Sequence, residues 1–334
     1  MRDRPRAVVF GVETLGVAAC YYGAGRLGLL RRLVVEDAVV TPVWPPTGVA
    51  LAFLLVLGLR AVPGIALGVL GVVVSISTPA LSTLGVLAGN TAAPVLAWLM
   101  LRRVGFRDDL GRLRDGLALV FLGALTGMLV SATTGVALLA ATDKIDTAAL
   151  PLVWLAWWTG DAMGVVIVTP LLLLLYRARR GPPRPPDRTG PPHRIEAAAL
   201  TAVACALVPL ATQSSASLLF LVYPLLIWTA LRFRLAGSML CALFASVLAT
   251  LAATDQRGPF AALTDAEIMI KLQAFNGTMA LTALLLSAVI TEQRDTRRSV
   301  ELACRELAEA LEHLTAGAGE PPPGRSRTGD DPPA

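Results

Sequence analysis

Long runs without a charged residue dominate this sequence, and they restrict its fold more than any other feature. Residues 61–101, 116–142 and 197–231 contain no Asp, Glu, Lys or Arg. Each run exceeds the roughly 20 residues that a helix needs to cross the hydrocarbon core of a bilayer. The whole chain is 16% charged, whereas soluble domains average about 25%. Because the bilayer core offers the backbone no water, the sequence predicts an all-α integral membrane protein.

Prolines, glycines and arginines divide the apolar chain into a predicted polytopic bundle of about ten transmembrane helices. The alternative is a bundle of eight helices, in which residues 43–77 are divided differently. The ten predicted spans cover approximately residues 7–30, 43–60, 63–77, 81–101, 116–141, 154–176, 195–211, 218–231, 235–253 and 269–290.

The arginines predict the orientation of this bundle, because cytoplasmic loops are enriched in Lys and Arg. Clusters occur at the N-terminus, at 102–115, at 177–194 and at 232–234, and ten spans place them on one side with both termini cytoplasmic. Arg31 and Arg32 are exceptions to this pattern. We therefore interpret the net charge of +5 as a consequence of how the chain is oriented in the membrane and not as a sign of nucleic-acid binding. The expected location is the plasma membrane, crossed many times, with the lipid bilayer as partner.

The N-terminus has some features of a signal peptide. Three arginines in the first six residues precede an apolar stretch, and residues 17–20 (VAAC) resemble a lipoprotein cleavage site that ends at Cys20. Glu13 interrupts the apolar stretch, however, and many spans follow it. We therefore expect an uncleaved first span, with lipidation of Cys20 as the alternative.

A single acidic residue, Asp161, lies within the span at 154–176. An ionisable group at membrane depth is costly and marks a functional position or a polar network. In one interpretation, Asp161 lies deep in the bundle with Asn90 and Thr47. In the other, residues 159–161 cap a helix that starts late, which keeps the carboxylate near the lipid headgroups. The sequence leaves both open.

The residues that most catalytic and metal sites require are scarce. The chain has two histidines, His193 and His313, and its four cysteines show no CxxC spacing. It contains no GxxxxGK[ST] loop, no GxGxxG between a strand and a helix, no HExxH motif and no recognisable Ser/His/Asp set. We therefore expect no enzymatic activity, no cofactor and no metal site.

Apolar periodicity continues beyond the last span. Apolar residues recur every three or four positions, and Glu301 and Arg305 form an i,i+4 pair. We expect a membrane domain over residues 1–295, a short cytoplasmic signalling or surface helix over 296–315 and a disordered tail over 316–334. The predicted signal-relay positions on the short helix are Val300, Ala303, Leu307 and Leu314.

Five short motifs follow one another along the chain: WPPTG at 44–48, GN at 89–90, W-x-GD-x-x-G at 158–164, YP-x-x-IW at 223–228 and GPF at 258–260. Their order resembles the first family of membrane-associated sensor (MASE) domains, over about residues 7–295. Members of that family are bacterial inner-membrane input domains, usually preceding histidine kinase, PAS, diguanylate cyclase or phosphodiesterase modules. The sequence departs from the family in two respects, since no output module follows residue 292 and Arg234 replaces a usual glycine.

The resemblance implies an input domain of bacterial signal transduction that detects a ligand or a membrane state. With no output module in the sequence, we expect it to act through a partner, either as a homodimer or with a separate signalling protein. Arg60 or Arg232 is the expected counter-charge of Asp161. The candidate ligand-binding or polar-network residues lie in the motifs, except for Arg232, which follows the YP-x-x-IW motif: Trp44, Pro45, Pro46, Thr47, Gly48, Asn90, Trp158, Gly160, Asp161, Gly164, Tyr223, Pro224, Trp228 and Arg232.

Two alternatives remain open at the level of sequence. The helix openings at Trp44-Pro45 and Tyr223-Pro224 echo each other, and repeated halves with broken helices are typical of transporters. A small carrier or permease that uses Asp161 is therefore the second hypothesis. The third is a remnant that lost its output domain and has no function of its own.

Overall fold

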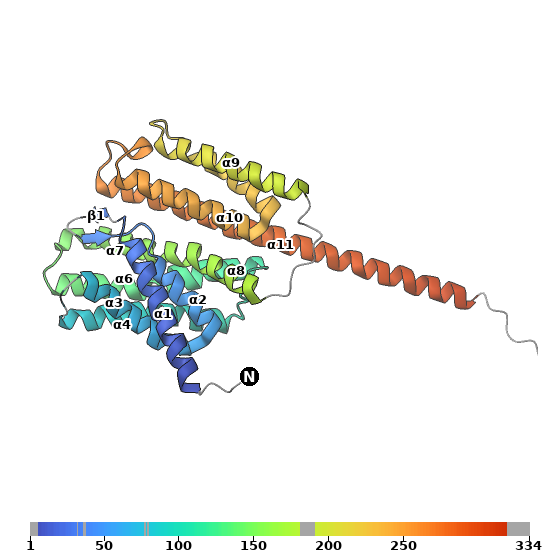
Figure 1. Ribbon diagram of the computed structural model, residues 1–334, viewed down its shortest axis with the longest axis horizontal. Helices are drawn as coiled ribbons and strands as arrows, with labels where there is room; N and C mark the ends of the chain where they lie inside the picture. Colours follow the sequence, from blue (N-terminus) through green and yellow to red (C-terminus); the bar gives the residue numbers. More distant parts are fainter. Residues whose placement is uncertain are drawn as a thin grey trace, which may run out of the picture. The chain divides into compact units, whose positions relative to one another are not determined.

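The computed structural model describes residues 6–31, 33–35, 38–76, 78, 80–180 and 191–318, and it is almost entirely helical (Figure 1). The first half begins with a helix, a two-stranded antiparallel hairpin and three further helices: α1 (Arg6–Gly28), β1 (Leu33–Val35), β2 (Ala38–Val40), α2 (Pro45–Leu57), the 3₁₀ turn η1 (Gly58–Ala61), α3 (Val62–Ile76) and α4 (Leu81–Arg103). The elements that follow up to residue 180 are α5 (Leu113–Ala118), the π-helix η2 (Leu119–Thr126), α6 (Leu129–Ala141), η3 (Thr147–Ala149), α7 (Leu150–Met163), the π-helix η4 (Gly164–Val168) and α8 (Thr169–Arg180).

The second half contains α9 (Pro191–Gln213), η6 (Leu219–Leu221), α10 (Val222–Thr254), η7 (Gly258–Phe260) and α11 (Asp265–Ala318). One compact unit ends at Thr291 and a second begins at Glu292, within α11. In the first unit, α1 packs along α3, α4 along α6 and α9 along α10. The predicted short helix at 296–315 is thus part of α11. Residues 181–190 of the predicted linker and 319–334 of the predicted tail lie outside the described residues.

Eight helices in the described part of the chain are long and apolar enough to cross a membrane. The alternative count of eight therefore matches, and the main prediction of ten is slightly too high. The difference arises from two continuous helical stretches, Pro45–Ile76 and Leu219–Thr254, each of which the sequence analysis had divided in two. In the first stretch, α2 and α3 have 13 and 15 residues. Each is about 20 Å long, which is short for the roughly 30 Å hydrocarbon core.

The helical stretch at Pro45–Ile76 is broken at Gly58, whose φ of +67° is in the region that favours glycine. Gly25 of α1 lies against both Pro46, at the start of α2, and Val72, near the end of α3. Since the start of one helix and the end of the next meet the same turn of α1, the chain reverses direction at Gly58. Helices α2 and α3 therefore form a hairpin.

The second stretch is broken in the same way at Arg234, with φ 56° and ψ −146°. Arg232, just before the break, forms an ion pair with Glu196 near the start of α9. Gly258, just after the end of α10, packs on Thr212 and on Gln213 at the end of α9. Helix α10 must therefore run back along α9 after the break. Glycine adopts the backbone conformation at position 234 readily. This explains why the resemblance to the family leads one to expect glycine, and not arginine, at this position.

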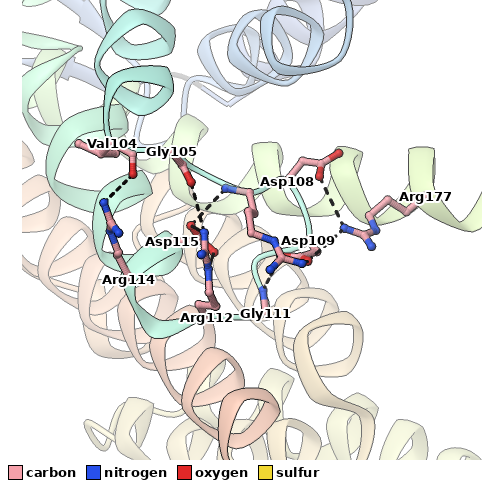
Figure 2. Close-up of polar contacts among 10 residues, drawn as sticks. Val104, Gly105, Asp108, Asp109, Gly111, Arg112, Arg114, Asp115 and Arg177 are labelled. Carbon is pink, nitrogen blue, oxygen red and sulfur yellow. Dashed lines mark hydrogen bonds and ion pairs between the residues drawn. The ribbon is translucent and has the colours of Figure 1, made fainter. Parts of the chain in front are cut away.

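A polar network organises the loop between α4 and α5 (Figure 2). The buried carboxylate of Asp115 accepts hydrogen bonds from the backbone N–H of Arg107, at 3.1 Å, and from the guanidinium of Arg112, at 2.8 and 2.9 Å. The same guanidinium donates to the carbonyl of Gly105, and that of Arg114 donates to the carbonyl of Val104. Because a buried carboxylate is tolerated only when paired and hydrogen-bonded, this network fixes the loop.

Arginine-rich segments distant in sequence meet at this end of the bundle. Arg177, near the end of α8, lies 3.6 Å from Asp108 and 3.9 Å from Asp109 (Figure 2). Gly111 lies beside Thr291 of α11. The clusters at 102–115 and 177–180 therefore share one end of the bundle, as their predicted cytoplasmic location requires.

The opposite end carries the β1–β2 hairpin and the start of α2. Arg31, an exception to the arginine pattern, is here paired with Asp255 at 2.8 Å. The ion pair joins the segment after α1 to the segment after α10. Arg31 thus has a local structural role that is independent of the orientation of the chain.

Replacing Arg234 with glycine should stabilise the protein. A residue other than glycine at this φ and ψ carries a backbone strain of about 1–3 kcal/mol, and the substitution relieves it. We expect a higher midpoint of thermal unfolding for Arg234→Gly in detergent micelles. Ala236→Gly is the matched control, because glycine at an exposed helical position costs about 1 kcal/mol and should lower the midpoint. An equal decrease for both variants would show that position 234 carries no strain.

Candidate functional site

The start of α2 is hydrogen-bonded to the last turn of α7. The backbone N–H of Trp44 donates to the carbonyl of Gly160 at 2.9 Å. The hydroxyl of Thr47 lies 2.9 Å from the carbonyl oxygen of Asp161 and 2.8 Å from that of Trp44. Two of the sequence motifs, WPPTG and GDxxG, therefore form one contact between helices.

Glycines make this close approach feasible. A Cβ atom on Gly160 would overlap the carbonyl oxygen of Thr41, and one on Gly164 would overlap that of Trp44. A Cβ on Gly48 would in turn overlap the carbonyl oxygen of Gly164. Pro45 opens α2 at a position where its missing N–H has no helical partner. The residues of both motifs are thus explained by packing of backbone on backbone, as for small residues at membrane helix interfaces.

The helix that carries Asp161 changes its winding directly after the contact. Residues Gly164–Val168 form the π-helix η4, and Thr169-Pro170 begins α8. Proline cannot donate the regular i→i−4 hydrogen bond, and its ring crowds the preceding turn. The hydroxyl of Thr169 donates to the carbonyl of Gly48 at 3.1 Å, which attaches this irregular region to α2. Single π-helical turns occur frequently at functional sites.

A cavity of about 150 Å³ lies beside this contact. Its wall is mainly aliphatic and aromatic, and its polar side-chain groups come from Tyr21, Thr41, Asn90 and Asp161 and from the indoles of Trp44 and Trp157. Helices α1, α3, α4 and α7 and the segment 40–44 contribute the lining, which consists of Tyr21, Leu29, Val40, Thr41, Trp44, Val69, Val72, Val73, Ile76, Val86, Asn90, Trp157 and Asp161.

Asp161 is the single acidic residue in the lining of this cavity, and its side chain is 1% exposed. Within the described residues, neither carboxylate oxygen has a hydrogen-bond partner. The hydroxyl of Ser131 and the indole of Trp157 face the carboxylate, and the Ser131 hydroxyl also lies 3.5 Å from the amide oxygen of Asn90. The interpretation of Asp161 as part of a late helix cap is wrong, because α7 begins at Leu150 and buries the residue.

The structure gathers only some of the predicted site residues. Trp44, Asn90 and Asp161 line the cavity, and the rest of the WPPTG and GDxxG motifs forms the contact beside it. Trp158 stacks on Trp154 and donates to the carbonyl of Leu125, and it does not line the cavity.

The motif at 223–228 lies elsewhere in the bundle. Tyr223, next to Pro224 in the first turn of α10, shares a hydrogen bond with Thr278 of α11. Trp228 is 43% exposed, and Arg232 is paired with Glu196. Neither Arg60 nor Arg232 lines the cavity, so Asp161 has no counter-charge from them.

Four polar or aromatic residues at this site were not predicted from the sequence: Tyr21, Thr41, Ser131 and Trp157. Trp157 precedes Asp161 by four residues and therefore shares its helix face, so helical spacing would have selected it over Trp158. The other three are brought near Asp161 by packing between helices. In the part of the chain that the structure describes, no group of three or more His, Cys, Asp or Glu residues is arranged to hold a metal ion.

The family model MASE1 matches residues 14–294, most of the chain. The chain belongs to the MASE1 family. MASE1 domains are membrane-associated sensory domains and not catalytic ones, so the resemblance predicted from the motifs is confirmed. No curated protein and no solved structure matches the chain.

The glycine contact gives a test of how this MASE1 domain is held together. Gly164→Ala forces a Cβ atom onto the backbone of Trp44, and overpacking of this kind costs about 1–3 kcal/mol. We expect a clearly lower midpoint of thermal unfolding in detergent. Gly23→Ala is the control, since a Cβ at Gly23 meets no atom within 4 Å and alanine favours the helix. Equal midpoints for Gly164→Ala and wild type would exclude backbone contact at this position.

Proposed function

We propose that this MASE1 chain is an input domain of bacterial signal transduction that binds a small ligand in the cavity beside Asp161 and acts through a separate partner. The observation that carries the proposal is the buried carboxylate of Asp161, which faces a cavity and has no hydrogen-bond partner among the described residues. Burying a polar group without a partner costs free energy. A ligand that supplies the partner is therefore favoured in this cavity.

Transmission requires that the ligand bind two arrangements of the bundle unequally. Segment 41–44 is suited to this role because it contacts the cavity on one side and α11 on the other. Thr41 and Trp44 line the cavity, and the amide of Gln273 in α11 donates to the carbonyl of Pro42 at 2.9 Å. A shift of this segment on ligand binding would change its contact with α11.

Helix α11 is the route to a partner in this proposal. It runs without interruption from Asp265 to Ala318. In the part of α11 that follows Glu292, where the second compact unit begins, Val300 and Leu307 are exposed apolar residues. Ala303 lies exposed between them. These positions are suited to contact a second copy or a cytoplasmic signalling protein. The side chain of Leu314, the fourth predicted relay position, lies outside the described part of the structure.

The arginines favour an orientation in the plasma membrane. If the end with Arg112 and Arg177 faces the cytoplasm, then the cavity, near the β1–β2 hairpin and Trp44, lies toward the outer side. In this orientation the stimulus comes from outside the cytoplasm. The partner then contacts the C-terminal, cytoplasmic end of α11.

A carrier is the second candidate, and one observation favours it. Both helical stretches that open with an aromatic–proline pair are broken at a positive φ, at Gly58 and at Arg234, and both fold back as hairpins. Repeated broken helices are typical of transporters. The sensor hypothesis requires the cytoplasmic part of α11 for output, whereas the carrier hypothesis does not require it for transport.

Asp161→Asn tests the sensory site, because it removes the charge and keeps the shape. We expect the output of the partner, sought as the kinase or cyclase encoded beside this gene, to change about fivefold or more, the lower range of allosteric coupling. Asp255→Asn is the matched control at the same end of the bundle, and its output should equal that of wild type. An unchanged output for Asp161→Asn would remove this carboxylate from the mechanism.

Deletion of residues 296–334 separates the sensor from the carrier. A sensor coupled through α11 should lose partner output, whereas a carrier should keep uptake by proteoliposomes. The shortened protein should still fold, since its compact unit ends at Thr291, and its thermal unfolding provides the control. Full partner output after the deletion would contradict the proposed route.

A further inference from the structure

We infer that the cavity beside Asp161 binds a small organic ammonium cation. This inference names the ligand class for the site on which the proposed function rests. It draws on the charge, the aromatic lining and the size of the cavity.

The charge of the site is incomplete without a ligand. Asp161 is almost fully buried and lines the cavity. The Ser131 hydroxyl and the Trp157 indole face its carboxylate, but both groups are neutral, and among the described residues neither carboxylate oxygen accepts a hydrogen bond. The lining contains no Lys, Arg or His. A buried carboxylate requires a paired charge or hydrogen-bond donors. An ammonium cation supplies both, whereas an anionic ligand would face the carboxylate with a like charge.

Aromatic side chains favour the same class of ligand. Tyr21, Trp44 and Trp157 line the cavity together with Asp161. A cation within about 6 Å of such a ring is attracted by the negative face of its π system, and tryptophan is the strongest partner. The cavity thus combines one carboxylate with three aromatic side chains, and aromatic side chains are the groups that form the cages for alkylated ammonium ions.

The remaining wall limits the ligand to a compact, mainly apolar body. Val69, Val72, Val73 and Ile76 of α3 form an aliphatic side. A volume of about 150 Å³ is far below the roughly 300–1,000 Å³ of typical drug-sized sites and matches an engineered cavity that binds benzene. Nucleotides and sugars are too large and too polar for this space. A cation with four or five carbon atoms or fewer fits it.

The test is a titration of the full chain in lipid nanodiscs with n-butylammonium, tetramethylammonium and n-butanol. Tryptophan fluorescence is the readout, because two tryptophans line the cavity, and calorimetry gives the affinity. We expect at least one cation to bind about 30-fold or more tightly than n-butanol, the range for a buried charge pair. Tighter binding of n-butylammonium would indicate N–H donation to Asp161, and tighter binding of tetramethylammonium would indicate the aromatic rings. Equal binding of n-butanol, or no binding of either cation, would overturn the inference.

Variants place the bound cation in the cavity. Asp161→Asn should weaken binding about 30-fold or more, and Val86→Phe should abolish it by filling the space. Val86→Phe keeps the carboxylate. It therefore shows whether the cation occupies the cavity itself or is only attracted from elsewhere by the charge of Asp161. Trp154→Phe is the control, since Trp154 lies outside the lining and its loss should leave the affinity unchanged. Unaltered binding by both Asp161→Asn and Val86→Phe would place the cation elsewhere and overturn the inference.

The two proposals fail in different ways. If neither cation binds but Asp161→Asn changes partner output, the ligand class is wrong and the sensory proposal stands. If a cation binds and partner output does not respond to it or to Asp161→Asn, the site is correct and the sensory proposal is wrong.

Discussion

The contact between the backbones of α2 and α7 is the interaction on which the rest of this structure depends. In a bilayer, helices gain little by burying apolar side chains from lipid, so close packing and hydrogen bonds between helices provide the specific attraction. Gly160 and Gly164 allow the start of α2 to approach until the N–H of Trp44 reaches the carbonyl of Gly160. This contact places segment 41–44 against α7 and holds Asp161 at the edge of the cavity.

The same contact separates the polar groups that hold the helices together from the carboxylate that lines the cavity. The hydroxyls of Thr47 and Thr169 are engaged by backbone carbonyls across the interface. The carboxylate of Asp161 is turned away from these bonds and toward the cavity. Helix α7 thus contributes its backbone to the contact with α2 and one acidic side chain to the lining of the cavity, at the cost of placing an acid at membrane depth.

Two breaks with positive φ determine how the bundle is assembled. Gly58 and Arg234 reverse the chain within stretches that are continuous in hydropathy. The first reversal brings both ends of the α2–α3 hairpin onto α1, and α3 contributes the aliphatic wall of the cavity. The second places the two parts of α10 along α9 and beside α11. The site meets α11 both through segment 41–44, where Gln273 bonds to Pro42, and through α7, where Met163 lies beside Gly277.

The sequence by itself determined the class of the protein. Charge-free runs predicted membrane helices, because no other helix can dispense with charge over such a length, and the order of the motifs predicted the family. The arginine clusters at 102–115 and 177–194 were predicted to share one end, and the loop at 102–115 does meet Arg177 of the second cluster there. Tertiary structure alone decided which of the motif residues meet. Trp157 and not Trp158 reaches the cavity, Tyr21 joins from a distant helix, and the Tyr223 motif lies apart from Asp161. The physical reason is that hydropathy and motif order report local preference and contact with lipid, whereas a cavity is defined by side chains from several helices whose rotation and depth depend on packing.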